Sequence, residues 1–128
     1  MLTAYPAGHV ADRVSRPHLL ALGCAVMVVA DLLMAFGTNL AMVFAGIAVW
    51  GVHMGLTEGL ISALTADAAP PTLRGTAFGV VNLARGLMLI AASALAGALW
   101  SWHGHEATFL AGAALAAVAA LASLMIRA

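Results

Sequence analysis

The chain has 128 residues, of which 64% are hydrophobic and only 8% are charged. Five arginines balance five acidic residues, so the formal net charge is zero. A soluble domain is typically about half apolar and a quarter charged, so this composition excludes an ordinary soluble domain and a disordered chain. The lack of a basic field also excludes a nucleic-acid binder. A single cysteine, Cys24, excludes a disulfide framework and a cysteine-based zinc site. The remaining class is an integral membrane protein.

Four stretches are long and apolar enough to cross a hydrocarbon core of about 30 Å, which takes about 20 residues in a helix. They are residues 19–36, 40–64, 76–100 and 107–126. The first three each hold one charged residue, which is Asp31, Glu58 or Arg85, and the fourth holds none. None alternates apolar with polar residues as a β-barrel strand does, and backbone groups in lipid must pair internally, so we predict helices.

The connections between these stretches are short, and all four prolines lie outside them, where the missing N–H costs little. Short loops make consecutive helices antiparallel neighbours. We therefore predict an all-α polytopic membrane protein: a four-helix antiparallel bundle in a single membrane domain over 1–128, whose first segment, 1–18, is a cytoplasmic loop.

The arginines outside the spans predict the orientation. They precede the first span, separate the second from the third and follow the fourth, at Arg13, Arg16, Arg74 and Arg127. The positive-inside rule makes that side cytoplasmic. Trp100 and Trp102 lie at the opposite end of the third span, where an interfacial aromatic belt is expected. Both termini are therefore expected in the cytoplasm, and the cell (inner) membrane is the expected location.

Polar residues are concentrated in the two middle spans. Ionisable residues within a membrane are costly, so they usually face a protein interior or a water-filled cavity. This places the second and third spans inside the bundle and leaves the first and fourth as lipid-facing supports. The candidates for a transport pathway or a coupling region are His53, Thr57, Glu58, Asn82 and Arg85.

The four ionisable residues of the spans allow two interpretations at each place where they occur. Glu58 and Arg85 lie at similar depths on antiparallel neighbours, so they can form a pair, either a proton or cation carrier tuned by the arginine or a static ion pair. His53 either titrates during transport or is neutral and hydrogen-bonded to a neighbouring helix. Asp31, in the outer part of the first span, has no evident partner and is either protonated or bonded to an unidentified polar group.

Glycines recur at four-residue steps, which lets helix backbones approach closely in membranes. The predicted helix-packing glycines are Gly51, Gly55, Gly59, Gly75 and Gly79. His103, His105 and Glu106 share the outer loop, but their spacing matches no closed zinc pattern, so we expect no metal site. No nucleophile arrangement and no phosphate-binding loop is present, so we expect no catalytic residues, no cofactor and no enzyme activity.

Two loop motifs resemble a known family. Residues 5–16, YPAGHVADRVSR, resemble the cytoplasmic G-x-L-A-D-R-x-G-R loop of the major facilitator superfamily (MFS). Residues 69–79, APPTLRGTAFG, are similar to the loop and helix start between its tenth and eleventh spans. The loop departs from the motif at Ser15, which replaces a glycine, and at His9, which replaces a basic residue.

The resemblance implies that the four spans correspond to the ninth to twelfth of such a transporter, so that the chain is a C-terminal fragment. In that family the tenth helix lines the pathway and the eleventh helps to gate it, which agrees with the two polar spans here. The implied cytoplasmic gate comprises Gly8, Asp12, Arg13 and Arg16. The equivalent carboxylate in the family docks against the other half of the transporter.

The sequence thus predicts transport of an unidentified small molecule by alternating access, coupled to protons, with the lipid bilayer and the missing transporter helices as partners. One alternative is a self-sufficient four-span transporter that acts as a homodimer. Another is a membrane assembly partner with no transport role. No nucleic-acid partner is expected in any of these cases.

Overall fold

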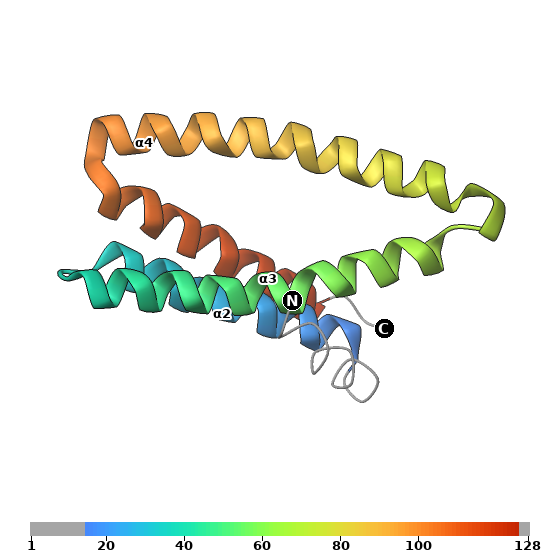
Figure 1. Ribbon diagram of the computed structural model, residues 1–128, viewed down its shortest axis with the longest axis horizontal. Coiled ribbons are helices and arrows are strands. Elements are labelled where there is room, and N and C mark those ends of the chain that lie inside the picture. The colour runs from blue at the N-terminus through green and yellow to red at the C-terminus, as the bar shows by residue number, and fades with distance from the viewer. Residues whose placement is uncertain (1–14, 126–128) are drawn as a thin grey trace.

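The computed structural model describes residues 15–125, which are helical with no strand among them. The elements are α2 (Arg16–Ala35), α3 (Leu40–Ala68), the short 3-10 helix η1 (Pro71–Leu73) and α4 (Arg74–Met125) (Figure 1). By length and apolar composition, all three α-helices can cross a membrane. The described part of the chain is therefore all-α, as predicted, and consistent with a polytopic membrane protein.

Local sequence explains where the helices begin and end. Pro17 lies in the first turn of α2, where no backbone hydrogen bond needs its missing N–H. Asn39 caps α3, its side-chain oxygen accepting a hydrogen bond from the backbone N–H of Met42 at 2.9 Å. Pro70 and Pro71 separate α3 from α4, since neither can continue the preceding helix. Helix α3 runs to Ala68, four residues beyond the predicted end of the second span at residue 64.

Gly104 breaks α4 into two arms, 74–103 and 105–125. Its backbone angles, φ 82° and ψ −176°, lie in a region that is essentially restricted to glycine. The arms turn back on each other at this point (Figure 1). The ring of Trp100 packs across the turn against those of His105 and Phe109, with centroid separations of 6.1 and 6.3 Å. The predicted loop at 101–106 is thus helical except at Gly104.

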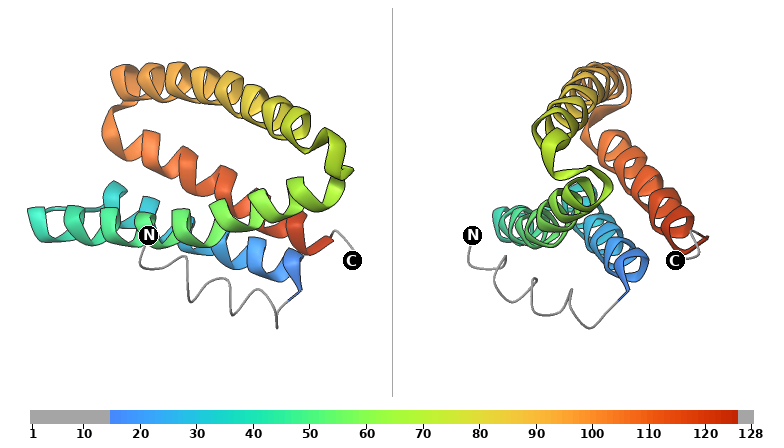
Figure 2. Two further views of the ribbon diagram at one scale, coloured as in Figure 1. Left: turned by 45° about the vertical axis from the view of Figure 1, so that its right-hand side comes forward. Right: turned by 90° about the vertical axis from the view of Figure 1, so that its right-hand side faces the viewer.

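Helix α2 lies at the centre of the packing. It contacts both α3 and α4 extensively, whereas α3 and α4 contact each other little (Figure 2). This differs from the expectation that the second and third spans form the interior. The reason is the placement of small residues: a Cβ on Gly23 of α2 would come within 2.6 Å of α3, and one on Gly112 of α4 within 2.7 Å of α2. Such positions allow close backbone approach.

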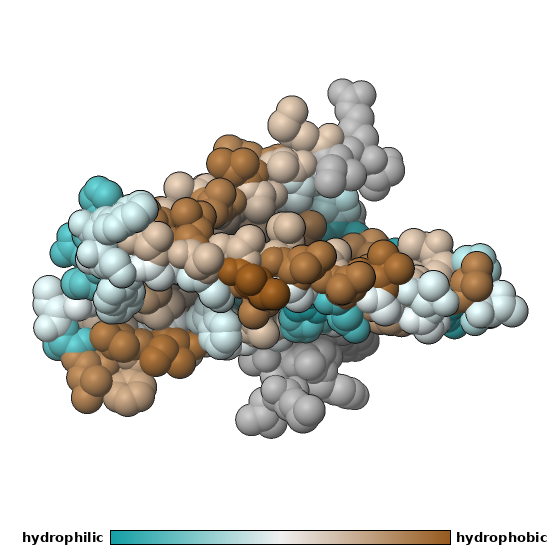
Figure 3. Space-filling model, turned by 90° about the horizontal axis from the view of Figure 1, so that it is seen from above, coloured by the Kyte–Doolittle hydropathy of each residue, from teal (hydrophilic) through white to brown (hydrophobic). Residues whose placement is uncertain are grey.

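Most large apolar side chains are exposed to the surroundings. The described core is small and consists of Leu19, Ala21, Ala30, Ala35, Leu60 and Ala113. In contrast, Leu87, Leu89 and Ile90 of the first arm of α4 are 56%, 67% and 70% exposed. Apolar side chains cover much of the face shown in Figure 3. A soluble monomer rarely exposes so much continuous apolar surface, so this surface fits contact with lipid or with further helices.

The backbone at Gly104 yields the first prediction. Replacing Gly104 by Ala forces a side-chain-bearing residue into a glycine-only conformation, at a cost of about 1–3 kcal/mol. We expect a lower melting temperature for Gly104→Ala, measured by circular dichroism in detergent. Gly97→Ala is the control, because Gly97 is in regular helix with nothing within 4 Å of an added Cβ. Equal melting temperatures for the two variants would show that the turn does not depend on this conformation.

Candidate transport site

An ion pair joins α3 to the first arm of α4. The Arg85 Nη1 donates to Glu58 Oε2 at 3.0 Å, and Nη2 donates to Oε1, so the contact is bidentate. The pairing that the sequence allows is therefore present. The side chains of Arg85 and Glu58 remain 42% and 40% exposed, so the pair lies on a face that the other described residues leave open. A bidentate arginine–carboxylate contact fixes both side chains in orientation as well as in charge.

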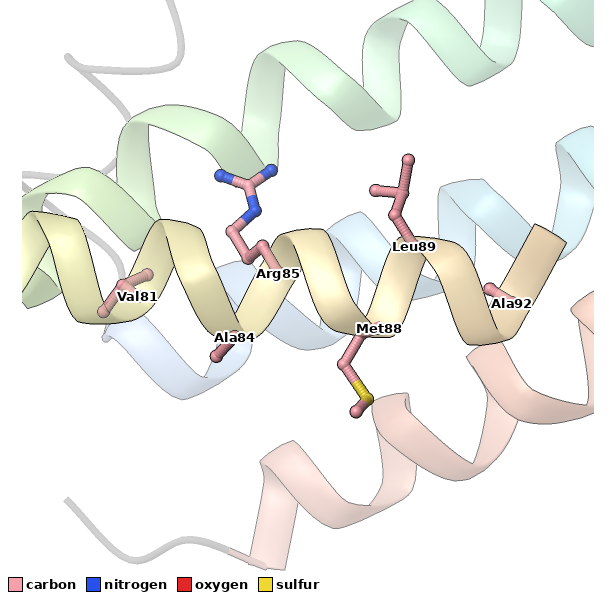
Figure 4. Close-up of a pocket in the computed structure, with 6 residues that line it drawn as sticks. All are labelled: Val81, Ala84, Arg85, Met88, Leu89 and Ala92. Carbon is pink, nitrogen blue, oxygen red and sulfur yellow. The ribbon is translucent and has the colours of Figure 1, made fainter. Parts of the chain in front are cut away.

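An open hollow of about 460 Å³ lies along the first arm of α4, with Arg85 in its lining. It is lined by Val81, Ala84, Arg85, Met88, Leu89 and Ala92, all from the first arm of α4 (Figure 4). In Figure 4 the guanidinium of Arg85 points toward α3, whereas Met88 points to the other side of its helix. The candidate site is thus an open apolar hollow with Arg85 in its lining and the paired Glu58 next to Arg85.

His53 and Thr57 lie on a different side of α3, facing α2. The His53 Nδ1 is 2.7 Å from the Gly23 carbonyl oxygen, which can only accept, so Nδ1 carries the proton. The Thr57 hydroxyl donates to the His53 carbonyl oxygen at 2.9 Å and is buried against Gly23. This contact corresponds to the second interpretation of His53, a hydrogen bond to a neighbouring helix. The structure therefore separates His53 and Thr57 from the charged pair.

Asn82 lies on the first arm of α4, three residues before Arg85, and is exposed. A three-residue step places two residues on the same side of a helix, so Asn82 lies on the side of Arg85. Of the five pathway candidates, the structure thus brings Glu58, Arg85 and Asn82 to one region. His53 and Thr57 form a separate helix–helix contact.

The predicted cytoplasmic gate lies mostly outside the described residues, which exclude Gly8, Asp12 and Arg13. Arg16 is described, and its guanidinium donates to the carboxylate of Asp67. This ion pair joins the start of α2 to the last turn of α3. The sequence did not indicate it, because Asp67 was expected in a loop and no spacing rule relates residues so far apart in the chain.

Four of the five predicted packing glycines make no close contact within the described part of the chain. An added Cβ on Gly51, Gly59, Gly75 or Gly79 would meet nothing within 4 Å. A role of these glycines and of Gly55 in packing against further helices stays a prediction. The close approaches occur instead at Gly23, Gly46 and Gly112.

Asp31 is the polar residue whose environment the sequence did not reveal. It is 3% exposed, and its Oδ2 has no hydrogen-bond partner among residues 15–125. The available signal was a single acid within an apolar span, which marks a functional site by default in membranes. Within the same range, no group of three or more His, Cys, Asp or Glu residues could hold a metal ion.

Comparison with known proteins identifies the family. The profile of the Major Facilitator Superfamily matches residues 1–128. The chain belongs to this superfamily. It is therefore an integral membrane protein of a family of transporters, not of enzymes, which supports a role in transport. The finding agrees with the resemblance carried by the two loop motifs.

This MFS chain is similar in sequence to several uncharacterised proteins. It is 31% identical over 121 residues to an uncharacterised MFS-type transporter of Methanocaldococcus jannaschii, covering 94% of this chain and 30% of the relative. It is 34% identical over 101 residues to uncharacterised proteins of Mycobacterium bovis and Mycobacterium tuberculosis, covering 79% of this chain and 23% of each relative. The chain thus spans less than a third of these relatives. No solved structure matches it significantly.

The contact between Gly23 and Thr57 yields a prediction about helix packing. A Cβ on Gly23 would lie 2.6 Å from the Thr57 Cγ2, so Gly23→Ala overpacks the α2–α3 interface, at a cost of about 1–3 kcal/mol. Thr57→Ser removes that methyl group and keeps the hydroxyl that bonds to His53. We expect Gly23→Ala to lower the melting temperature in detergent, and the double variant to recover most of the loss.

Additivity tests this interpretation. Substitutions at residues in contact are not additive, whereas independent ones are. If the double variant melts at the temperature expected from the sum of the two single effects, the two helices do not meet at this point.

Proposed function

We propose that this chain forms the last four transmembrane helices of an MFS-type secondary transporter, which moves a small molecule by alternating access coupled to protons. In this assignment α2 and α3 are the first two helices, and the two arms of α4 are the last two. At a rise of 1.5 Å per residue the arms are about 45 Å and about 30 Å long, each sufficient to cross a bilayer.

The observation that carries the proposal is the Glu58–Arg85 pair, on a face that the described residues leave uncovered, with Arg85 also lining an open apolar hollow. A charge within a membrane is costly unless it faces protein or water, so a partly exposed pair needs a covering surface. In transporters of this kind the substrate lies between two halves of the molecule near the midplane. An open charged face on one part is consistent with such a pathway, with Asn82 beside it.

The arrangement of the helix ends supports the proposed orientation. The Arg16–Asp67 pair joins the start of α2 to the end of α3, and Arg74 begins α4 shortly afterwards along the chain. The turn between α2 and α3 and the turn at Gly104 lie at the opposite end (Figure 1). The arginine-bearing ends are therefore together, which the positive-inside rule assigns to the cytoplasm, with both termini on that side.

A homodimer of self-sufficient four-span chains is the second candidate. The observation that favours it is the open space beside Gly51 and Gly59 on α3, where the backbone of a second copy could approach closely. In that case the uncovered face would be an interface between two identical chains.

The size of the native product distinguishes the two candidates. An immunoblot of host membranes is expected to show a band of at least about three times 12.9 kDa, since the chain spans 30% or less of its relatives. A band at 12.9 kDa, with a crosslinked product of twice that mass, would replace this proposal by the homodimer.

The transport role of the ion pair is then tested in proteoliposomes that contain the intact product. A pH-sensitive dye inside the vesicles reports proton movement on addition of compounds from a panel of small molecules. We expect Glu58→Gln to abolish the coupled proton movement. Glu106→Gln, an exposed acid in the turn region, is the matched control and should behave as wild type. Unchanged coupling in Glu58→Gln would remove Glu58 from the pathway.

A further inference from the structure

A second cavity lies where three helical segments converge, away from the Glu58–Arg85 pair. Its volume is about 340 Å³. Helix α2 contributes three residues, α3 two and the second arm of α4 one: Met27, Asp31, Met34, Ile47, Trp50 and Phe109. Figure 2 shows the second arm of α4 running beside α2. The second cavity is therefore built on three helical segments, and Ile47 and Trp50 lie on its exposed side.

Asp31 is the only charged residue of this lining, and it is almost fully buried. Its exposure is 3%, and its Oδ2 lacks a hydrogen-bond partner within residues 15–125. A buried carboxyl group without a partner is unfavourable by several kcal/mol unless a positive charge or a proton neutralises it. The helices provide neither an arginine nor a lysine in the lining. The neutralising charge is then either a proton on the carboxyl group or a cation bound beside it.

The other lining residues select the kind of cation. A metal ion needs several oxygen, nitrogen or sulfur ligands, and the second cavity offers one carboxylate among aliphatic, thioether and aromatic groups. The lining does contain two aromatic rings, those of Trp50 and Phe109, and aromatic rings attract organic cations. Apolar walls with one polar anchor, in a volume above about 300 Å³, are typical of a site for a small organic molecule.

Gly112 leaves room for the Asp31 carboxylate. A Cβ at this position would lie 2.7 Å from the Asp31 Oδ2 and 3.3 Å from its Cγ. Any residue larger than glycine would therefore push the carboxylate aside. The absence of a side chain at Gly112 is what allows Asp31 to remain buried at the edge of the second cavity.

We propose that the second cavity binds a lipophilic organic monocation, with the Asp31 carboxylate as its counter-ion and Trp50 and Phe109 as its aromatic walls. The site goes beyond the proposed function, because it uses none of the residues assigned to the transport pathway. The cation site is tested by equilibrium binding, without any transport. Either proposal, the cation site or the transport pathway, can therefore fail while the other holds.

The test is binding of radiolabelled tetraphenylphosphonium to the full chain, purified in detergent and measured by equilibrium dialysis. We expect saturable binding to the wild type. Asp31→Asn keeps the shape of the side chain but removes its charge. Its affinity for the cation should fall by at least about tenfold, since an interaction with a full charge is lost. Asp67→Asn, the same substitution at an acid outside the second cavity, should bind as wild type.

Two further measurements exclude a general effect on folding. Asp31→Glu restores the charge and should recover part of the affinity, whereas Gly112→Ala keeps the charge but displaces it and should weaken binding. Triphenylphosphine oxide, a neutral compound with similar rings, should not distinguish wild type from Asp31→Asn. The proposal is overturned if the wild type shows no saturable binding, or if Asp31→Asn and wild type bind the cation equally.

Discussion

The structure depends on one constraint: in a hydrocarbon environment, polar groups must find their partners within the protein. Backbone groups satisfy it by forming helices, which is why residues 15–125 are helical almost without interruption. The charged side chains within the helices do not all find a partner. Glu58 and Arg85 pair with each other across α3 and α4, whereas Asp31 is buried without a partner. These are two of the places where the described helices depart from a purely apolar bundle.

Close packing in this chain comes from small residues at a few positions. Gly23, Gly46 and Gly112 bring neighbouring helices together around α2, while the first arm of α4 stays largely apart from them. The contact between that arm and α3 includes the Glu58–Arg85 pair, so a polar interaction spans a region where apolar packing is sparse. The uncovered face that results is expected if the chain is part of a larger transporter. This is the role proposed for this member of the superfamily.

The sequence predicted the helical class, the membrane environment and the family, because hydropathy, span length and loop motifs each carry that information directly. It also allowed the Glu58–Arg85 pair, since antiparallel neighbours bring residues of equal depth together. It did not predict the central position of α2, the burial of Asp31 against Gly112 or the Arg16–Asp67 pair. Helices that are apolar all round give no amphipathic direction, so periodicity could not show which face meets which neighbour.

The central claim is that apolar helices cross the bilayer with their arginine-bearing ends on the cytoplasmic side and the Gly104 turn on the other. Cysteine accessibility tests it most directly. In a Cys24→Ala background, Arg74→Cys and Trp102→Cys are each treated with a membrane-impermeant maleimide, in intact cells and after permeabilisation. The account predicts labelling of Trp102→Cys in intact cells and of Arg74→Cys only after permeabilisation. Labelling of both positions from the same side would contradict it.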